Sequence, residues 1–450
     1  MRNPQWTKLL LLVLVVLLLG TNACGTGNAG VVYVLASWTG AEEDDFRKVL
    51  GVFEKATGIT VKYNGTRALE QVLASEVQRG TAPDVAVLPN PGSLATYARQ
   101  DKLHPLGDLL GPQGGYGGQW LALEKAGTGQ QYAIAVKVDL KSAIWYDTTN
   151  LDGATPATWD ELLALSRQLT ADGRTPWCLG MGAPPTSGWP GTDWIEDILL
   201  HSAGADDYRR WAAGKVPWTS AQVRKAWTDW GALVAVPGAV RGGAPAALLT
   251  EFGDAGRGLF TRPARCVLEH QASFVMGGYS AMTRADGSSP APGKDFAFFP
   301  FPGPAVSEVS ADLAAMFHNT PQARELMKFL ASDQAQRIWP GIRRGSVFSA
   351  DRNVGDVYDD DVSRQVSSTL TSPDRRLCFD GSDLMPAKMT GAFYQAVLEY
   401  LVDPSRLDAL LANLDVVRLS VPAGEWLDIP CGQAGVEIGP GTSSQPRPTR

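Results

Sequence analysis

The feature that most limits the fold is an alternation of strand-like and helix-like segments near the start of the sequence. Short apolar runs, rich in β-branched residues, occur at residues 31–35, 59–63 and 85–88. Such runs are typical of strands buried on both faces of a parallel sheet. Amphipathic stretches between these runs predict helices, so the order strand, helix, strand, helix, strand predicts an α/β fold.

The first predicted helix has a recognisable beginning and end. Thr39 and Glu42 have the spacing of a capping box, and acidic residues follow, which suits the positive end of a helix dipole. Phe46 and Phe53 belong to its expected buried face, and Gly58 is its expected stop. Under this interpretation the capping box alone accounts for Glu42.

The rest of the chain continues the mixed pattern. Further strands are predicted at residues 132–138, 144–146 and 297–300, and further helices at residues 158–169, 193–201, 220–233 and 321–339. The strand at 297–300 is so far downstream that it has to join an existing sheet, which indicates a chain that crosses between two units. Ligands of α/β sheets bind at the carboxyl ends of strands, so the loops at 38–42, 64–66 and 89–92 are candidate binding loops.

Composition excludes several other classes of protein. The 450 residues are 44% hydrophobic and 19% charged, which describes a folded chain of two or three domains rather than a disordered one. The 40 basic residues are outnumbered by 47 acidic ones, and no long Lys/Arg run interrupts the sequence. Nucleic acid is therefore not an expected partner.

The N-terminus predicts export. Arg2 and Lys8 precede a Leu/Val run that is too short to span a bilayer, and small residues follow it. Residues 1–23 are thus a predicted signal peptide, either an ordinary one or a lipoprotein signal. In the second case, which we favour, Cys24 carries a lipid that anchors the chain to the cell membrane. Residues 24–30 would be a flexible tether, and the Pro/Ser/Thr/Arg tail at 435–450 is expected to be disordered.

Export also suggests a role for the remaining cysteines. Cys178, Cys266, Cys378 and Cys431 form an even set, as expected for two disulfides in an oxidising compartment, with free buried thiols as the alternative. Sequence alone allows three pairings. We expect Cys178 with Cys266 and Cys378 with Cys431, since this keeps each bridge within one stretch of chain. The spacings match no zinc site, and neither a metal nor a cofactor is expected.

The order of several motifs resembles a known family. The motifs are Ser37-Trp38-Thr39-Gly40, Pro89-Asn90-Pro91-Gly92, Ile144-Trp145-Tyr146, the long segment from Ser187 to Asp197, His270 to Phe274, and Asp380 to Pro386. Together they are similar to the carbohydrate-binding proteins of ABC importers, particularly the α-glucoside branch, from about Val31 to Cys431. Asn90 departs from this family, whose members often have Gln there.

The resemblance implies a periplasmic-binding-protein-like α/β fold of two lobes, each a mixed sheet flanked by helices, with hinge crossovers. Residues 31–138 and 294–318 would form lobe one, and residues 139–293 and 319–434 lobe two. It also implies a monomer that takes a small saccharide and delivers it to the transmembrane subunits of a permease, without catalysis.

A saccharide site needs aromatic platforms for the apolar sugar faces, surrounded by amides or carboxylates for the hydroxyls. Trp189 is the strongest candidate, because it stands between Gly188 and Pro190 without apolar periodicity. Trp38 is favoured because core burial gives it little reason to be there, and Trp145 is chosen over Tyr146 as the cleft-facing residue. The full set of expected ligand-binding residues is Trp38, Glu42, Asn64, Thr66, Asn90, Trp145, Trp189, Asp193, Gln271, Phe274, Asp383 and Tyr394.

Structural roles compete for some of these residues. Asp193 could cap a helix, Asn64 and Thr66 could form a turn, and Tyr394 could belong to a helix core. Two other functions also remain open. A secreted glycoside hydrolase would need two carboxyls facing each other, for which Glu42 and Asp193 are available. A surface carbohydrate adhesin would lack a deep cleft. A Ser/His/Asp hydrolase is disfavoured, because no Gly-x-Ser-x-Gly elbow neighbours a histidine.

Overall fold

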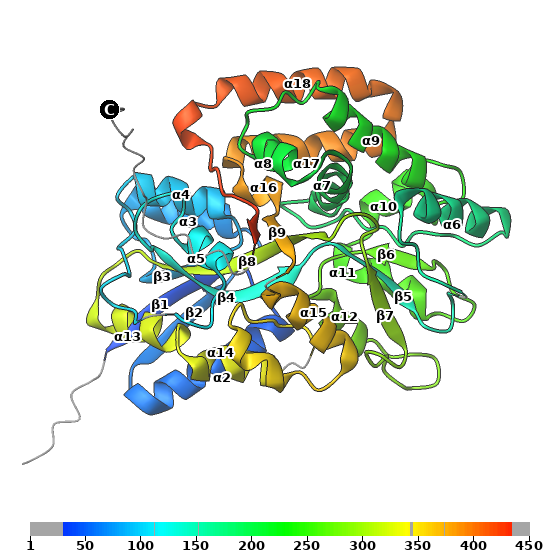
Figure 1. The fold of residues 1–450 in the computed structure, drawn as a ribbon. Helices are drawn as coiled ribbons and strands as arrows, with labels where there is room; N and C mark the ends of the chain where they lie inside the picture. The colour runs from blue at the N-terminus through cyan, green and yellow to red at the C-terminus, as the bar shows by residue number, and fades with distance from the viewer. Residues whose placement is uncertain (1–29, 112, 152, 343–344, 373, 434–450) are drawn as a thin grey trace, which may run out of the picture.

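The computed structural model describes residues 30–433, apart from residues 112, 152, 343–344 and 373 (Figure 1). The predicted signal peptide, the lipidation site at Cys24, the tether before Gly30 and the tail at 435–450 lie outside the described residues.

The larger of two sheets contains seven strands in the order β10-β9-β8-β3-β1-β2, with β4 also paired to β8. Its strands are β1 (Val31–Ala36), β2 (Thr60–Gly65), β3 (Val85–Leu88), β4 (Ala133–Leu140), β8 (Val306–Met316), β9 (Arg376–Phe379) and β10 (Gly432–Gln433). The sheet is mixed, since β1 runs parallel to β2 and β3, whereas β8 runs antiparallel to β3 and β4. The predicted N-terminal α/β alternation is therefore present.

Helices cover both faces of this sheet. They are α2 (Ala41–Thr57), α3 (Leu69–Arg79), α4 (Pro91–Arg99), α5 (Gly118–Glu124), α13 (Pro321–Leu330) and α14 (Asp333–Ile342). In Figure 1, α3, α4 and α5 lie above the strands, and α2, α13 and α14 lie below them. Helix α2 buries Phe46 and Phe53 as predicted and ends at Gly58, whose φ of 75° is left-handed.

The smaller sheet has the order β6-β5-β7, with both pairs antiparallel. Its strands are β5 (Ala143–Asp147), β6 (Leu268–His270) and β7 (Phe296–Pro300). The remaining helices are α6 (Trp159–Ala171), α7 (Trp189–Ala203), α8 (Ala205–Ala212), α9 (Ala221–Val234), α10 (Gly243–Leu249), α11 (Phe252–Ala255), α12 (Val275–Ala281), α15 (Asp361–Thr371), α16 (Gly381–Leu384), α17 (Ala387–Val402) and α18 (Leu407–Ser420). Short 3-10 turns are η1 (Gly256–Phe260), η2 (Arg352–Val357), η3 (Pro404–Arg406) and η4 (Ala423–Glu425).

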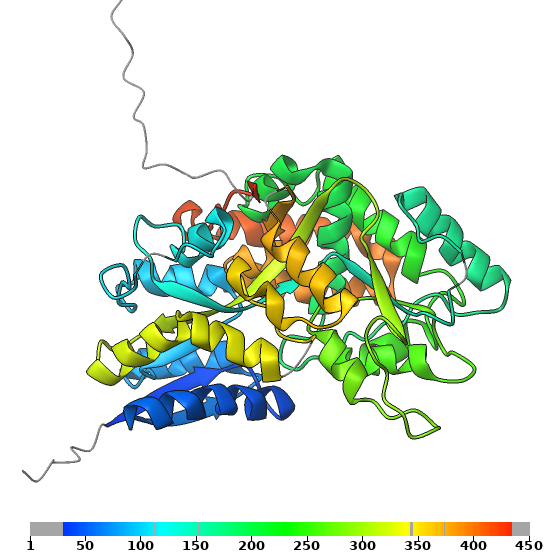
Figure 2. The same ribbon diagram turned by 60° about the horizontal axis from the view of Figure 1, so that its bottom comes forward.

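The two sheets belong to different sides of the molecule. Figures 1 and 2 both place the blue N-terminal strands on one side and the green segments around β5, β6 and β7 on the other. The chain leaves the large sheet between β4 and β5, returns between β7 and β8, and leaves it again after β9. These crossovers lie side by side, since Lys141 N donates to Glu308 O at 2.9 Å and Asp380 N donates to Val309 O at 2.9 Å.

Three of the expected lobe assignments differ from the observed packing. Strands β9 and β10 pair within the large sheet, although residues 319–434 were expected to belong with the small one. Strand β7 pairs with β5 in the small sheet, although residues 294–318 were expected to belong with the large one. Helices α13 and α14 pack near β8 and α2 beside the large sheet, although residues 319–434 were expected to belong with the small one. The reason is that the chain crosses back after β7 rather than before it, which a single apolar strand does not reveal.

Helices α6 and α2 differ in how their first turns are capped. Thr158 accepts from Glu161 N, and the full capping box is present at α6. The predicted capping box of Thr39 and Glu42 is wrong, because the N-cap of α2 is Gly40 without a side-chain cap. The carboxylate of Glu42 is taken by ion pairs instead, described below.

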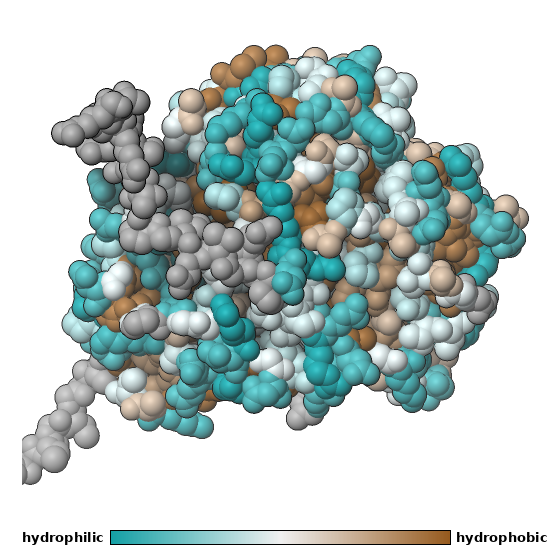
Figure 3. Space-filling model, viewed as in Figure 1, coloured by the Kyte–Doolittle hydropathy of each residue, from teal (hydrophilic) through white to brown (hydrophobic). Residues whose placement is uncertain are grey.

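Both expected disulfides are present, joining Cys178 to Cys266 and Cys378 to Cys431. The second bridge ties β9 to the segment just before β10. Among the described residues, no helix is long and apolar enough to cross a membrane. The face in Figure 3 is mostly polar, with apolar residues gathered at its top, over α18, where Val416 and Leu419 are exposed.

Glu124, at the end of α5, is a fully buried carboxyl beside the large sheet. Its oxygens accept from Ala135 N at 2.9 Å and from Gln131 Nε2 at 2.8 Å. Burial outweighs these hydrogen bonds and raises the pKa of Glu124 to about 8. Because the folded protein binds this proton more tightly than the unfolded chain, the stability that it contributes is complete below about pH 4.5 and is lost as pH rises through about 8.

As pH rises from 5 to 8, the free energy of unfolding of a Glu124→Gln variant should therefore fall by about 1–2 kcal/mol less than that of the parent protein. Denaturant unfolding at several pH values measures this difference. The exposed Glu325→Gln variant serves as control and should keep the slope of the parent. A Glu124→Gln protein with the parent's pH dependence would show that this carboxyl does not titrate in that range.

Candidate ligand-binding site

A cavity of about 510 Å³ lies between the two sides of the molecule. Its wall combines residues around β1, β3, β4 and β8 with residues around α7, α11, α12, α16 and α17. Strands of the large sheet and helices from the other side of the molecule therefore face a common space, and the crossovers run beside it.

One side of the cavity is aromatic. The ring centroid of Trp189 lies 5.0 Å from that of Phe252 and 6.0 Å from that of Phe274, and these two phenyl rings are 6.1 Å apart. We call these three residues the aromatic wall; Tyr394 lies on the same cavity. The indole and Phe252 are only partly buried, so part of each ring is accessible to an apolar ligand surface.

Gly188 positions the indole at the start of α7. This N-cap has a φ of 108°, which favours glycine, and a Cβ there would lie 2.5 Å from the Tyr394 carbonyl oxygen. The close approach joins the beginning of α7 to α17. Trp189 was expected in a loop before a helix at residue 193, but it is the first residue of that helix.

The first charged group on the wall is the Lys137 cluster, formed by Lys137, Glu42, Asp139 and Asp312. Lys137 Nζ lies 3.5 Å, 3.4 Å and 3.7 Å from carboxylate oxygens of Glu42, Asp139 and Asp312. Burial lowers the pKa of Lys137, but the surrounding carboxylates outweigh it and raise the pKa above its usual value. Burial raises the pKa of Asp312 to about 6, against the opposing effect of Lys137.

The second group is the Lys141 cluster, formed by Lys141, Asp193 and Asp380. Lys141 Nζ lies 2.8 Å from an oxygen of each aspartate and 5.1 Å from the ring centroid of Trp189. Burial raises the pKa of Asp193 to about 6, and Lys141 opposes this effect. Burial raises the pKa of Asp380, but the attraction of Lys141 together with hydrogen bonds from Lys141, Asp383 N and Ser382 outweighs burial, so the pKa is lowered. The cluster joins the crossover after β4 to α7 and to the crossover after β9.

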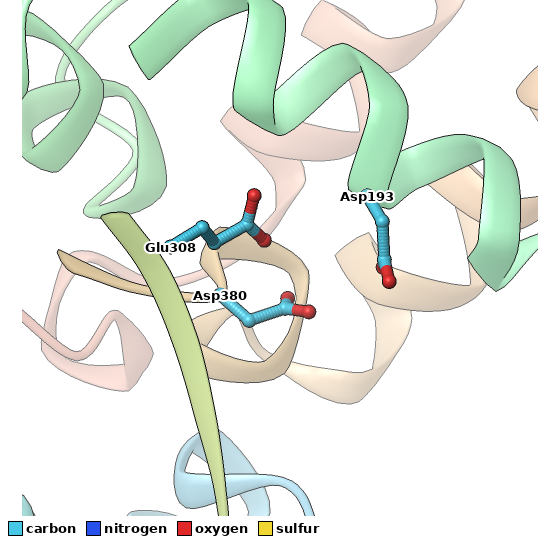
Figure 4. Close-up of side chains that lie close together, drawn as sticks. All are labelled: Asp193, Glu308 and Asp380. Carbon is cyan, nitrogen blue, oxygen red and sulfur yellow. The ribbon is translucent and has the colours of Figure 1, made fainter. Parts of the chain in front are cut away.

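Glu308 adds a third carboxyl beside this cluster. Oxygens of Asp193, Glu308 and Asp380 lie within 4.8 Å of one another (Figure 4). Within the described part of the chain the Glu308 carboxyl has no hydrogen-bond partner, and burial together with Glu196 raises its pKa well above the usual value. Asp193 and Asp380 are already paired with the ammonium of Lys141. We therefore interpret the three carboxyls as part of a structural ion cluster between the crossovers.

A buried hydrogen-bond network extends from the same crossover. Ser142 Oγ donates to Asp197 Oδ1 at 2.5 Å and accepts from Glu308 N at 2.6 Å. The other oxygen of Asp197 lies 2.7 Å from His270 Nε2. Serine, aspartate and histidine meet here, but all three are at least 95% buried, so they hold the crossovers together rather than meet a substrate.

The structure brings eight of the expected ligand-binding residues to the cavity. They are Trp38, Glu42, Asn90, Trp189, Asp193, Phe274, Asp383 and Tyr394. Asn90 Nδ2 donates to Asp383 Oδ1 at 2.7 Å, which links the start of α4 to α16. Contact of these residues with a ligand stays a prediction.

Four expected residues do not line the cavity. Asn64 is exposed, and Thr66 Oγ1 accepts from Ala68 N at 3.2 Å, which is a turn interaction. Gln271 is 3% exposed, and its Oε1 accepts from its neighbour Ala272 N. Trp145 is completely buried, 5.0 Å from Phe298 between ring centroids.

The choice of Trp145 over Tyr146 as the cleft-facing residue is therefore wrong. Strand β5 is the central strand of the small sheet, so one of its faces is packed inside that unit, and neither ring reaches the cavity. Trp38 was expected to have little reason for core burial, and this expectation is wrong. Its indole is only 2% exposed and packs against Phe46 and Trp339, so the core accounts for most of its burial even though it borders the cavity.

Sequence reasoning missed both lysines, Asp139, Asp312 and Phe252. A usable signal existed for three of them. Lys137, Asp139 and Lys141 recur at every second position of an otherwise apolar strand, and buried charged residues on one strand face require partners. Phe252 and Asp312 carried no such local signal.

Comparison with known proteins settles the family. The sequence model of the family of bacterial extracellular solute-binding proteins matches residues 39–337 of this chain. The chain belongs to this family. The predicted membership among solute-binding proteins is thereby confirmed.

Two relatives of this solute-binding protein cover most of its length. The alpha-glucosides-binding periplasmic protein AglE of Rhizobium meliloti (strain 1021) is 34% identical over 394 residues, which are 83% of this chain and 84% of AglE. The osmoprotective compounds-binding protein GgtB of Synechocystis sp. (strain ATCC 27184 / PCC 6803 / Kazusa) is 34% identical over 397 residues, which are 85% of this chain and 91% of GgtB.

Solved structures confirm the expected fold class. A chitin oligosaccharide binding protein superposes with a TM-score of 0.73 at 17% identity, covering 87% of this chain and 98% of that one. The bacterial solute receptor AcbH gives a TM-score of 0.72 at 19% identity, with coverage of 87% and 98%. The solute-binding protein thus has the two-lobed fold with mixed sheets, flanking helices and crossovers.

Proposed function

We propose that this solute-binding protein captures a small saccharide in the cavity between its lobes and delivers it, unaltered, to the transmembrane subunits of an ABC importer. The observation that carries the proposal is that the aromatic wall and the Lys137 and Lys141 clusters line one cavity, where Lys137 Nζ lies 5.3 Å from the ring centroid of Phe274 and Lys141 Nζ 5.1 Å from that of Trp189. Aromatic ring faces suit the C–H face of a sugar, and carboxylates suit its hydroxyls. The relatives named for α-glucosides, chitin oligosaccharides and other solutes support a carbohydrate ligand.

Closure of the lobes would couple binding to transport. The crossovers are short and lie side by side, and the cavity wall draws on both lobes. A ligand that touches both walls stabilises the closed form by its higher affinity for that form. The closed form is then the one that a permease recognises.

Binding without catalysis is the better interpretation of the carboxyls. Glu42 and Asp193 were the pair available to a glycoside hydrolase. Glu42 pairs with Arg67 and Lys137, and Asp193 pairs with Lys141. Carboxylates held by cations in this way favour hydroxyl recognition over proton transfer to a leaving group, and a cavity of this volume argues against a flat adhesin surface.

A thermal-shift screen tests the proposal directly. The purified chain is heated with maltose, trehalose, sucrose and chitobiose, and with longer oligosaccharides of each linkage. A ligand at 100 times its dissociation constant should stabilise the protein by about 2.7 kcal/mol, which raises the melting temperature by several degrees. Calorimetry should then give one site per chain. Saccharide capture would be refuted if no saccharide of the panel raised the melting temperature, or if the protein released reducing sugar at enzymatic turnover.

Anchoring at Cys24 is the second part of the proposal, together with a monomeric state outside the cytoplasm. It rests on the predicted lipoprotein signal that precedes this residue. In cells, a Cys24→Ser chain should move from the membrane fraction to the soluble exported fraction, because a thioether-linked lipid can no longer form. Fractionation with immunodetection measures the shift. A Cys24→Ser chain that stays in the membrane fraction like the parent would contradict lipid anchoring.

A further inference from the structure

Acidic side chains outnumber basic ones on the cavity wall. Eight carboxyl groups line the cavity, against three cationic side chains, Arg67, Lys137 and Lys141. A saccharide site needs hydrogen-bonding groups, but a neutral ligand by itself requires no such excess of one sign.

The three cations are already paired with protein carboxylates. Arg67 Nη2 lies 3.0 Å from Glu42 Oε2, and the two lysines are the centres of the Lys137 and Lys141 clusters. An anionic ligand would have to take a cation away from its carboxylate. Among the described residues of the wall, no cationic side chain stands without such a partner.

Carboxyl oxygens, by contrast, are left over. Asp383 receives one hydrogen bond, from the amide of Asn90, and within the described residues it makes no ion pair. Asp193 is 2% exposed, yet its Oδ1 has no hydrogen-bond partner among those residues. Burial and the nearby Asp380 raise the pKa of Asp383 well above its usual value, Lys141 opposes this rise only in part, and a ligand ammonium beside the carboxyl would oppose it further. The cavity wall therefore has carboxyl oxygens that can accept hydrogen bonds from a ligand, whereas its cationic side chains are already paired with protein carboxylates.

Resting on the proposed function, we propose that Asp383 makes the cavity select saccharides by charge, with amine-bearing sugars preferred over neutral ones and sugar acids rejected. A sugar ammonium supplies the missing partner of Asp383, and its charge is attracted by the whole wall. A sugar carboxylate meets the same carboxyls in a partly desolvated cavity, where like charges repel strongly. The preference is thus set by both an attractive and a repulsive element.

The test compares three ligands that differ at one position. The neutral parent ligand is whichever of maltose, trehalose and sucrose binds the protein most tightly. Its affinity is compared with those of its 6-amino-6-deoxy and 6-carboxylate derivatives, each made at either ring. Calorimetry at pH 7 and low salt should give an affinity for the better amine at least about 100-fold above that for the better acid, with the neutral parent between them. Raising the salt concentration should reduce the amine-to-acid affinity ratio only in part, because the carboxyl groups of the cavity wall are buried.

Two variants assign the preference to Asp383. Asp383→Asn keeps an oxygen for the Asn90 amide and should reduce the amine-to-acid ratio by about tenfold or more while the neutral parent still binds. The matched control is Glu251→Gln, which removes a carboxyl from the exposed rim of the same wall and should change the ratio by less than about threefold.

The outcomes separate the two proposals. If the neutral parent binds but its carboxylate binds equally well, the charge selection is refuted and saccharide capture stands. If the amine-to-acid ratio is the same in Asp383→Asn as in the parent protein, Asp383 does not set it. If no saccharide of the thermal-shift panel and none of these derivatives binds, saccharide capture itself fails and the charge selection with it.

Discussion

Replacing Lys141 by methionine should lower the free energy of unfolding at pH 7 by about 3–5 kcal/mol. The ammonium lies 2.8 Å from oxygens of both Asp193 and Asp380, and all three side chains are buried. Methionine fills the volume but leaves two carboxylates without their cation. Removing one partner of a buried ion pair is costly because the remaining charge stays desolvated.

The loss should depend on pH. Asp193 has a pKa of about 6 even with Lys141 beside it, and removal of the lysine raises that pKa further. A carboxyl with a raised folded pKa is stabilising below its unfolded pKa and loses that contribution as pH rises through the folded value. The deficit of Lys141→Met should therefore be larger at pH 8 than at pH 5, as measured by denaturant unfolding of the ligand-free protein.

The matched control is Lys48→Met. Lys48 pairs with Asp45 at 2.7 Å, but its side chain is 59% exposed, so the substitution should cost no more than about 1 kcal/mol at any pH. Equal losses in the two variants would show that the Lys141 cluster contributes no more than a surface ion pair.

Replacing Trp189 by alanine should weaken saccharide binding by about 2–3 kcal/mol, which is about 30- to 150-fold, while the fold persists. The indole is the part of the aromatic wall that is packed against both phenylalanines and still partly exposed. Its loss removes the flat surface on which an apolar sugar face would lie. Calorimetry with the tightest saccharide of the thermal-shift panel measures the change.

Trp426→Ala is the matched control for this variant. Trp426 is likewise half-buried, but it packs near Gly214 and does not line the cavity. Its truncation should lower the melting temperature and leave the affinity of the folded protein unchanged. Unchanged affinity in Trp189→Ala would instead remove this residue from the binding site.

Much of the fold could be predicted from local pattern. The strands β1, β2 and β3 and the buried face of α2 follow from apolar runs and helical spacing, which are properties of neighbouring residues. Pairing of the four cysteines was also predicted, from chain proximity. The place of β7 was not, because an isolated apolar strand carries no information about which sheet it joins.

The site was predicted less completely, and the reason is visible in single residues. Trp189 could be singled out because its neighbours are Gly188 and Pro190 and no apolar period explains it. Trp145 and Tyr146 alternate along a strand, but alternation says only that they point to opposite faces, not that one face is open. Phe252 joins the aromatic wall from a short helix far along the chain.

The sequence by itself determined the α/β class, the family and a group of loop residues around a saccharide-like site, because motifs and periodicity are local. Only the tertiary structure decided which of these residues line the same cavity and which cations pair with their carboxylates. Lys137 lies in β4 and Lys141 directly after it, but their carboxylate partners come from β8, α2, α7 and the segment after β9, as well as from β4 itself. Electrostatic partnership depends on distance in space, and that distance exists only once both lobes have folded.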